Sequence, residues 1–193
     1  VRCASGGGDG AWSGCSAVEY GGAVDLMSNV DVKGPLNTYH QWRMGIIKNS
    51  DITQVWKSQS VDLKYTNSPS GTRAIFIRDG KQTYWIEYRK AVDGYSPGLA
   101  IYRTDPPPAS SIVSPNAADA ADAPSTAVTT DVWLLNLDAF FYYSSTVYSG
   151  SPILPIGQTF LDSSGNVTLT ATQKDADTLT VNISRKPDLN APP

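Results

Sequence analysis

The sequence contains few of the side chains on which most catalytic and metal centres depend. Its 193 residues include one histidine, His40, and two cysteines, Cys3 and Cys15. A catalytic zinc site commonly uses two or three histidines, and a Ser/His/Asp or Cys/His nucleophile system needs a histidine as its base. Such chemistry would have to be built around His40, around carboxylates, or with residues from outside this chain. His40 falls in a short helical segment, where a packed or surface role is more common than a catalytic one.

Charge and long apolar runs are also scarce. Charged residues make up 17% of the sequence and the formal net charge is -3, so no basic field would attract a nucleic acid. The longest apolar stretch, residues 132–143, is interrupted by Asn136 and Asp138. It is shorter than the roughly 20 residues of a membrane-spanning helix. We therefore predict neither a nucleic acid nor a membrane as a partner.

Composition and cysteine spacing favour a secreted, extracellular protein. Cys3 and Cys15 flank a glycine-rich segment in a chain rich in serine, threonine and tyrosine. A bridge that closes a loop of this size stabilises the fold by about 3 kcal/mol, so we predict a Cys3–Cys15 disulfide. Two free buried thiols are the alternative. The sequence starts at Val1 with neither a methionine nor an apolar leader. From this we expect a mature product or a part of a longer protein.

The pattern of apolar residues predicts a mainly β fold that follows a loop and a short helix. Residues 35–44 carry apolar side chains at helical spacing between Gly34 and Gly45, which predicts a helix of about three turns. Asp79-Gly80 stands between two β-branched and aromatic runs, a strong signal for a hairpin. Strand-like runs in the first half cover residues 52–65, 74–78, 83–89 and 99–103.

The second half predicts further strands after a long irregular segment. Residues 106–130 are rich in proline, alanine and aspartate and show no helix or strand period, which indicates a surface loop. Short alternating runs follow at residues 132–137, 157–160, 166–172 and 178–184. About seven short strands separated by turn residues are typical of an antiparallel β-sandwich. We expect residues 1–50 to form the loop and helix, and residues 51–193 to form one sandwich from whose edge residues 106–130 depart.

Two segments resemble the end of a known catalytic domain. Residues 19–29 (Glu-Tyr-Gly-Gly-Ala-Val-Asp-Leu-Met-Ser-Asn) and residues 36–46 (Leu-Asn-Thr-Tyr-His-Gln-Trp-Arg-Met-Gly-Ile) are similar to the part of gametolysin-like and immune-inhibitor-A-like secreted zinc metallopeptidases that follows their zinc-binding helix. The resemblance implies that Met27 is the turn methionine, whose thioether forms an apolar floor beneath the zinc ligands. The sequence departs from the family pattern at Gly22, where an acidic residue is usual, and at Ser28, where glycine is usual.

The strands of the second region extend this resemblance. Residues 84–89, 98–103 and 131–138 look like strands of the β-sandwich that follows the catalytic domain in the same enzymes. The family's His-Glu-x-x-His motif, in which histidines hold zinc and the glutamate activates water, is missing here. We therefore expect no metal site, no cofactor and no peptidase activity in this chain alone, and zinc in the parent enzyme.

Two explanations of the missing motif stay open. Either the zinc helix lies upstream or in a separate chain, or the protein descends from a peptidase and has lost the site. If a partner segment is missing, an apolar patch should be exposed around Met27, Leu36 and Trp42, or covered by a second chain. The expected function is then a non-catalytic C-terminal section of a secreted metallopeptidase-like protein, which supports the catalytic cleft and contributes to binding of a protein or glycan substrate.

The alternative function is a stand-alone extracellular β-sandwich binding module, for adhesion or for binding a carbohydrate or a protein. Its candidate binding residues are Trp12, Trp42, Tyr142 and Tyr143, because aromatic side chains stack on sugar rings and anchor protein interfaces. Ordinary core packing is the other interpretation of the same aromatic residues.

Glu87 and Arg89 form the remaining candidate pair. Both share a strand face with Trp85, because side chains two residues apart in a strand point the same way. We interpret them as part of an ion-pair ladder, with Arg78 or Arg103 on neighbouring strands, rather than as a catalytic pair.

Overall fold

The computed structural model describes residues 34–80, 82–91, 96–104, 152–162 and 164–186, together with Leu26 and short strands in the rest of the chain. Two short helices precede the main strands: the α-helix α1 (Thr38–Arg43) and the 3-10 helix η1 (Asn49–Asp51). The strands of the two main sheets are β3 (Ile52–Val55), β4 (Gln59–Lys64), β5 (Ala74–Asp79), β6 (Gln82–Arg89), β7 (Gly98–Arg103), β9 (Trp133–Leu134), β12 (Ile153–Pro155), β13 (Thr159–Leu161), β14 (Val167–Asp175) and β15 (Thr178–Arg185).

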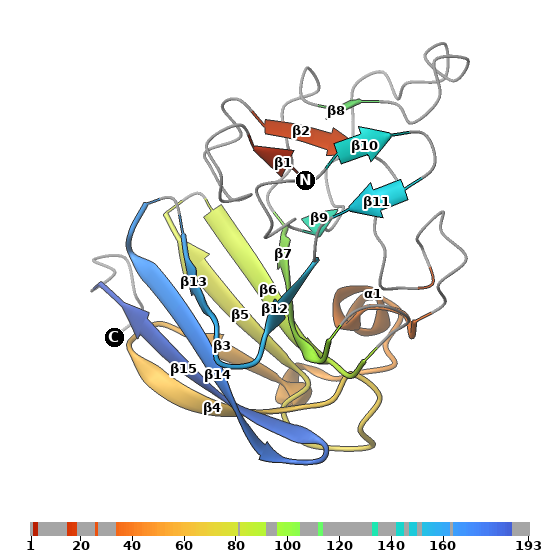
Figure 1. Cartoon of the computed structure of the whole chain (residues 1–193). Coiled ribbons are helices and arrows are strands. Elements are labelled where there is room, and N and C mark those ends of the chain that lie inside the picture. Colours follow the sequence, from red (N-terminus) through yellow and green to blue (C-terminus); the bar gives the residue numbers. More distant parts are fainter. Residues whose placement is uncertain are drawn as a thin grey trace.

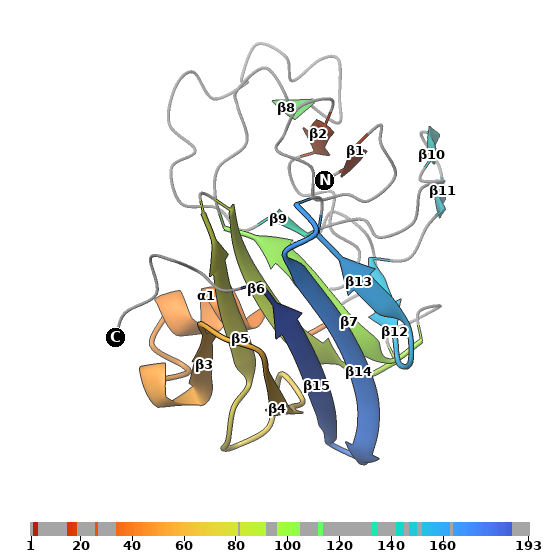
Figure 2. The same ribbon diagram turned by 90° about the vertical axis from the view of Figure 1, so that its left-hand side faces the viewer.

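These strands form two sheets that pack face to face as a β-sandwich (Figure 1). The first sheet has the order β12-β7-β6-β5-β3, with β9 also paired to β7, and the second has the order β13-β14-β15-β4. Neighbouring strands are antiparallel except for β3 and β5, which run parallel. The chain crosses between the sheets at both edges, because β3 leads into β4 and β12 leads into β13 (Figure 2). The predicted mainly β sandwich is therefore confirmed.

The main core lies between the sheets and follows the alternation of the sequence. In β14, residues 167, 169 and 171 are buried, whereas residues 172–175 are exposed. The same alternation in β15 buries Leu179, Val181 and Ile183 against β6 and β7. The outer face of the second sheet stays open to solvent, as is common for antiparallel sheets.

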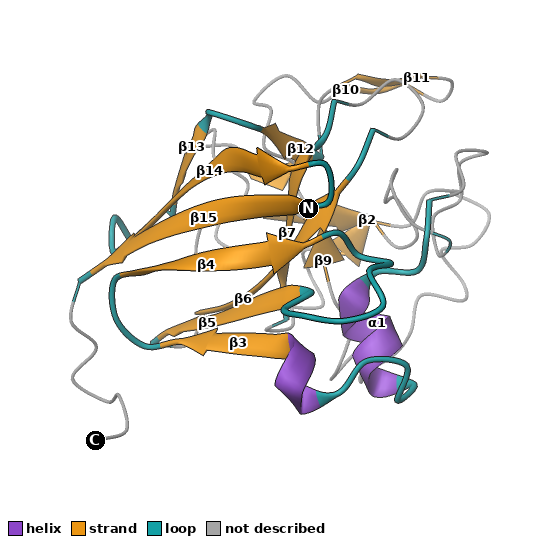
Figure 3. Ribbon diagram, turned by 90° about the horizontal axis from the view of Figure 1, so that it is seen from below, coloured by secondary structure: helices purple, strands orange, loops and turns teal. Residues whose placement is uncertain are grey.

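The first sheet differs because its central strands are buried on both faces. Every residue of β7 is buried, as are residues 84–89 of β6. The outward-facing side chains pack against α1 and form a second apolar cluster that includes Tyr39, Trp85 and Tyr102. Figure 3 shows α1 and the turn before β3 on the side of the molecule away from β14 and β15. This covered outer face positions the candidate site.

Several sequence predictions can be compared with these elements. The hairpin around Gly80 is confirmed, with Gly80 at φ 58° between β5 and β6. The helix is shorter than the predicted three turns, because Asn37 caps its start and Gly45, at φ 74°, ends it. The run of residues 52–65 forms two strands in different sheets rather than one, separated by a bend at residues 56–58.

The smaller strands lie beyond one end of the sandwich (Figure 1). They are β1 (Arg2–Cys3), β2 (Cys15–Val18), β8 (Ile112–Val113), β10 (Tyr142–Ser144) and β11 (Val147–Ser149). Apart from β8, which pairs with β2, the predicted loop at residues 106–130 lies outside the described residues. The pairing of β1 with β2 places Cys3 directly opposite Cys15. Directly opposed strand positions have the Cα separation that a disulfide needs, so the predicted bridge stays a prediction with a compatible register.

Within the part of the chain that the structure describes, no helix has the length and apolar character required to cross a membrane.

Gly98 offers a test of how β7 and β12 fit together. A Cβ added at Gly98 would lie 2.0 Å from the carbonyl oxygen of Leu154 and 2.9 Å from a methyl group of Ile153. Since the obstacle is backbone, Gly98→Ala should force the two strands apart and lower the free energy of unfolding by about 3 kcal/mol. Gly165→Ala is the matched control, because nothing lies within 4 Å of its Cβ position and only its φ of 67° is strained. The control should cost about 1 kcal/mol. If urea unfolding showed an equal loss of unfolding free energy for the two variants, the close packing of β7 against β12 would be contradicted.

Candidate functional site

The start of helix α1 is held on the outer face of the first sheet by the buried carboxylate of Glu87, in β6. Oxygen Oε2 of Glu87 accepts hydrogen bonds from the backbone N–H of Thr38 (2.6 Å) and from its hydroxyl group (2.7 Å). Oxygen Oε1 accepts hydrogen bonds from Arg89 Nε (2.7 Å) and from the hydroxyl of Tyr102 (2.7 Å). Glu87 and Thr38 are fully buried. Charge-assisted bonds of this kind are stronger than neutral ones, so the helix is fixed where it begins.

Arg89 and Trp85 extend this network in two directions. Arg89 pairs with Glu87 and also donates from Nη1 to the carbonyl oxygen of Pro35 (2.6 Å). Trp85 donates from its indole N–H to the hydroxyl of Thr38 (2.7 Å). The loop before α1, the helix itself and two strands of the sheet are therefore joined by one set of buried hydrogen bonds.

This network corrects one prediction from the sequence. Glu87 shares a face with Trp85 as predicted, but its ion-pair partner is Arg89 of the same strand rather than Arg78 or Arg103. The β6–β7 register turns Arg103 to the inner face of the sheet. Arg78 lies on β5 opposite the start of β6, too far along the strand to reach Glu87.

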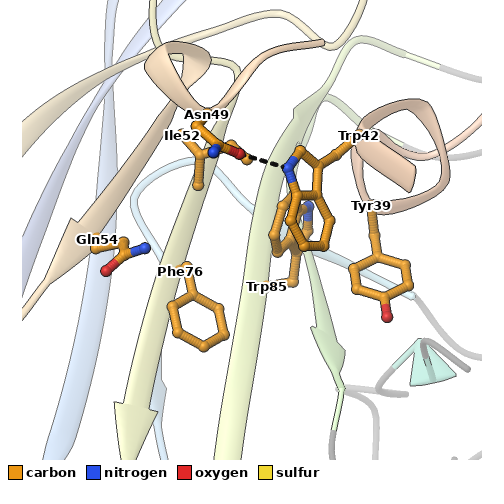
Figure 4. A pocket seen from close by; sticks show the side chains of 7 residues that line it. All are labelled: Tyr39, Trp42, Asn49, Ile52, Gln54, Phe76 and Trp85. Carbon is orange, nitrogen blue, oxygen red and sulfur yellow. Dashed lines mark hydrogen bonds between the residues drawn. The ribbon is translucent and has the colours of Figure 1, made fainter. Parts of the chain in front are cut away.

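An aromatic groove lies beside this network, between α1 and the β3 edge of the first sheet (Figure 4). Its volume is about 270 Å³. Helix α1, the η1 turn and strands β3, β5 and β6 provide its lining, which consists of Tyr39, Trp42, Asn49, Ile52, Gln54, Phe76 and Trp85. Strand alternation explains the sheet residues, because Ile52 and Gln54 share one face of β3 and the partner strands present Phe76 and Trp85.

The aromatic rings of the groove support one another. Trp42 lies over Trp85 with ring centroids 5.6 Å apart and an interplanar angle of 34°. Tyr39 and Phe76 contact Trp85 edge to face, at 5.4 and 6.4 Å. Offset and edge-to-face geometries are the favourable arrangements for aromatic pairs. Trp85 is buried and forms the base, whereas Trp42 and Phe76 are half-buried and offer ring surface to a ligand.

Polar side chains set the position of Trp42 and the rim of the groove. The indole N–H of Trp42 donates to Asn49 Oδ1 at 2.8 Å, the bond drawn in Figure 4. Gln54 is exposed, and its amide is directed toward Phe76 across the opening. The lining contains no charged side chain. The groove therefore combines aromatic surface with neutral amide donors and acceptors.

The η1 turn that carries Asn49 is fixed by Asp51. Oxygen Oδ2 of Asp51 accepts hydrogen bonds from the backbone N–H of Lys48 (2.8 Å) and from Arg73 Nη2 (2.6 Å). The Lys48 N–H bond is the main reason that the pKa of Asp51 lies below its usual value, and the Arg73 guanidinium lowers it further. Asn49 and Ile52 flank this contact, so the Asp51 carboxylate helps to hold one wall of the groove.

None of the other candidate residues from the sequence is among the described residues that line the groove. His40 lies outside the groove lining, where its Nδ1 and the side-chain amide of Asn37 are 2.9 Å apart. Trp12 and Met27 lie outside the described residues. The backbones of Tyr142 and Tyr143 form part of strand β10, which pairs with β11. Across the described ranges, no group of three His, Cys, Asp or Glu residues could hold a metal ion.

Of the predicted binding residues, the structure brings Trp42 into the groove, and most of the other lining residues were not predicted. Asp79 pairs with Gln82 at the hairpin, which places Phe76 opposite Trp85. The predicted hairpin would have indicated that Phe76 and Trp85 are opposite each other if the sequence had also fixed the register of its two strands. Nothing in the sequence signals that α1 would cover the same strands, because that contact joins residues 49 positions apart.

No protein-family model, curated protein sequence or solved structure matches the chain.

Replacing Glu87 by alanine tests the buried network. The change removes the acceptors of Thr38, Arg89 and Tyr102 and leaves the arginine charge buried without its carboxylate. Breaking a buried ion pair on one side commonly costs about 3 to 5 kcal/mol, so Glu87→Ala should lower the free energy of unfolding by that amount. Asp62→Ala is the control, because it breaks the solvent-exposed Lys174–Asp62 pair on the second sheet and should leave the melting temperature nearly unchanged. Glu87→Ala melting like the wild type would refute the anchoring role.

The lowered pKa of Asp51 predicts how the stability of the fold depends on pH. Because its pKa is lowered in the folded state, its contacts stabilise the fold above the unfolded pKa of about 4 and are lost as the pH falls through the folded value. Asp51→Asn should therefore be less stable than the wild type at pH 7, and the difference should shrink between pH 4 and pH 2. Thermal melts of both proteins across this range measure the effect. A difference that stays constant with pH would contradict the assignment.

Proposed function

We propose that this chain is a non-catalytic binding module and that the aromatic groove is its binding site. The observation that carries the proposal is the chemistry of the lining: four aromatic rings and two side-chain amides with no charged group. Concave sites lined by apolar and aromatic side chains, with a few polar groups that orient the ligand, are typical of small-ligand binding sites. None of the lining residues is a histidine, carboxylate or cysteine that could act as a base or nucleophile.

Preorganisation of the groove supports this function. Trp85 is fixed by its hydrogen bond to Thr38, and Trp42 is fixed by Asn49. Side chains that are already immobile lose little conformational entropy when a ligand binds. A groove built this way can bind a small ligand without first ordering a loop.

The setting of this module within a secreted zinc metallopeptidase-like protein is a second proposal. It rests on the sequence resemblance, and one structural observation favours it. Met44 and Ile46, in the segment that resembles the end of the catalytic domain, are 70% and 58% exposed. Two members of the expected apolar patch, Leu36 and Trp42, are half-buried, and the third, Met27, lies outside the described residues. An upstream catalytic segment, or a separate chain, would cover Met44 and Ile46.

The coding sequence upstream of Val1 decides between the two settings. A His-Glu-x-x-His motif in the same reading frame would support the peptidase section, whose parent enzyme would bind zinc. A signal peptide directly before Val1 would instead support the stand-alone extracellular module and exclude an upstream zinc helix.

Trp42 provides the test of the groove itself. Truncation of a central aromatic anchor commonly costs 2 kcal/mol or more of binding free energy, so Trp42→Ala should raise the Kd by about 30-fold or more. Isothermal titration against members of oligosaccharide and short-peptide libraries measures the affinity, and circular dichroism checks the fold. Trp56→Ala is the control, because Trp56 is also half-buried but does not line the groove. Binding that survives Trp42→Ala, or is equally reduced by the control, would place the site elsewhere.

A further inference from the structure

We infer that the ligand of the aromatic groove is a neutral carbohydrate, which stacks on Trp42 and Phe76 and hydrogen-bonds with the amides of Gln54 and Asn49. This inference rests on the proposed function and adds the ligand class. It follows from the charge of the lining, the pairing of aromatic with amide groups, and the size of the groove.

The uncharged lining of the groove disfavours ionic ligands as a class. An ionic ligand in this groove would lose part of its hydration without gaining a counter-charge, which is costly. Arg43, which follows Trp42 in α1, donates from Nη1 to the hydroxyl of the lining residue Tyr39 at 3.4 Å, so its guanidinium is engaged at the edge of the groove. Asp51 and Arg73 pair with each other at 2.6 Å, and Arg78, two residues after Phe76 on β5, donates from Nε to the carbonyl oxygen of Gly80. The groove therefore favours a ligand without charge.

The aromatic and amide groups together match a sugar ring. A pyranose has an apolar face of C–H groups, which packs on the negatively polarised face of an aromatic ring, and a rim of hydroxyl groups. Trp42 and Phe76 supply the half-buried ring surface. The exposed Gln54 amide can both donate to and accept from hydroxyls, and Asn49 keeps its Nδ2 donors because its Oδ1 is the atom bonded to Trp42.

The size of the groove favours a small ligand over a peptide. At about 270 Å³ it lies just below the roughly 300 to 1,000 Å³ of typical small-molecule sites, which suits one or two sugar rings. A peptide would also bring main-chain N–H and C=O groups that each need a partner, and the lining offers two side-chain amides for them. A neutral sugar leaves fewer polar groups unsatisfied in this site.

The test compares three ligand classes against the full chain, Trp42→Ala and two glutamine variants. Isothermal titration and saturation-transfer NMR are run with neutral oligosaccharides of glucose, mannose, galactose and N-acetylglucosamine, with oligouronates, and with a library of short peptides. Gln54→Ala should weaken binding of a neutral oligosaccharide by about tenfold, the effect of one lost hydrogen bond. Gln59→Ala, which removes a partly exposed glutamine from β4 in the other sheet, should have no effect.

The outcomes separate the ligand class from the site. A neutral oligosaccharide whose binding depends on Trp42 and Gln54 supports the inference. Tighter binding of oligouronates, or Trp42-dependent binding of a peptide and of no sugar, overturns the neutral carbohydrate while the binding module stands. If no sugar or peptide binds in a Trp42-dependent manner, the proposed function and this inference both fail.

Discussion

The carboxylate of Glu87 is the contact on which the arrangement of the first sheet depends. A charge taken out of water is costly, and this one is offset by hydrogen bonds from Thr38, Arg89 and Tyr102 at 2.6 to 2.7 Å. Those partners belong to a helix and two strands, so the carboxylate can be satisfied only when all three elements are in place. The polar network therefore specifies where α1 docks. Apolar contacts alone would fix this position less well because they are not directional.

The docked helix makes the two faces of the sandwich different. The second sheet keeps a solvent-exposed outer face, whereas the outer face of the first sheet is covered along β6 and β7. The groove lies beside α1, toward the β3 edge of the first sheet. Trp85 belongs to both features, since its indole N–H joins the network and its ring forms the base of the groove. The same buried contacts that stabilise the fold hold the lining of the groove in place, which under the proposed function would link stability to ligand binding.

Local patterns predicted much of the fold. The period-two alternation of β14 and β15 buries one face and exposes the other, and a glycine with positive φ turns the β5–β6 hairpin at Gly80. The sequence could not show that the run of residues 52–65 divides between two sheets. Its alternation is the same in either sheet, because periodicity records which face is buried and not which strand lies beside it. Alternation placed Arg89 on the same face of β6 as Glu87, but it could not show that Arg103 on the neighbouring strand faces inward.

The sequence by itself determined the class of fold, the hairpin, and the shared face of Trp85 and Glu87, since each follows from spacing within one segment, and it named Trp42 as a candidate binding residue. Only the tertiary structure decided that Trp42 meets Trp85 and Phe76 in a groove, and that Thr38 closes on Glu87. Such contacts join residues far apart in the chain. Their formation depends on the register and packing of whole elements, which no local pattern encodes.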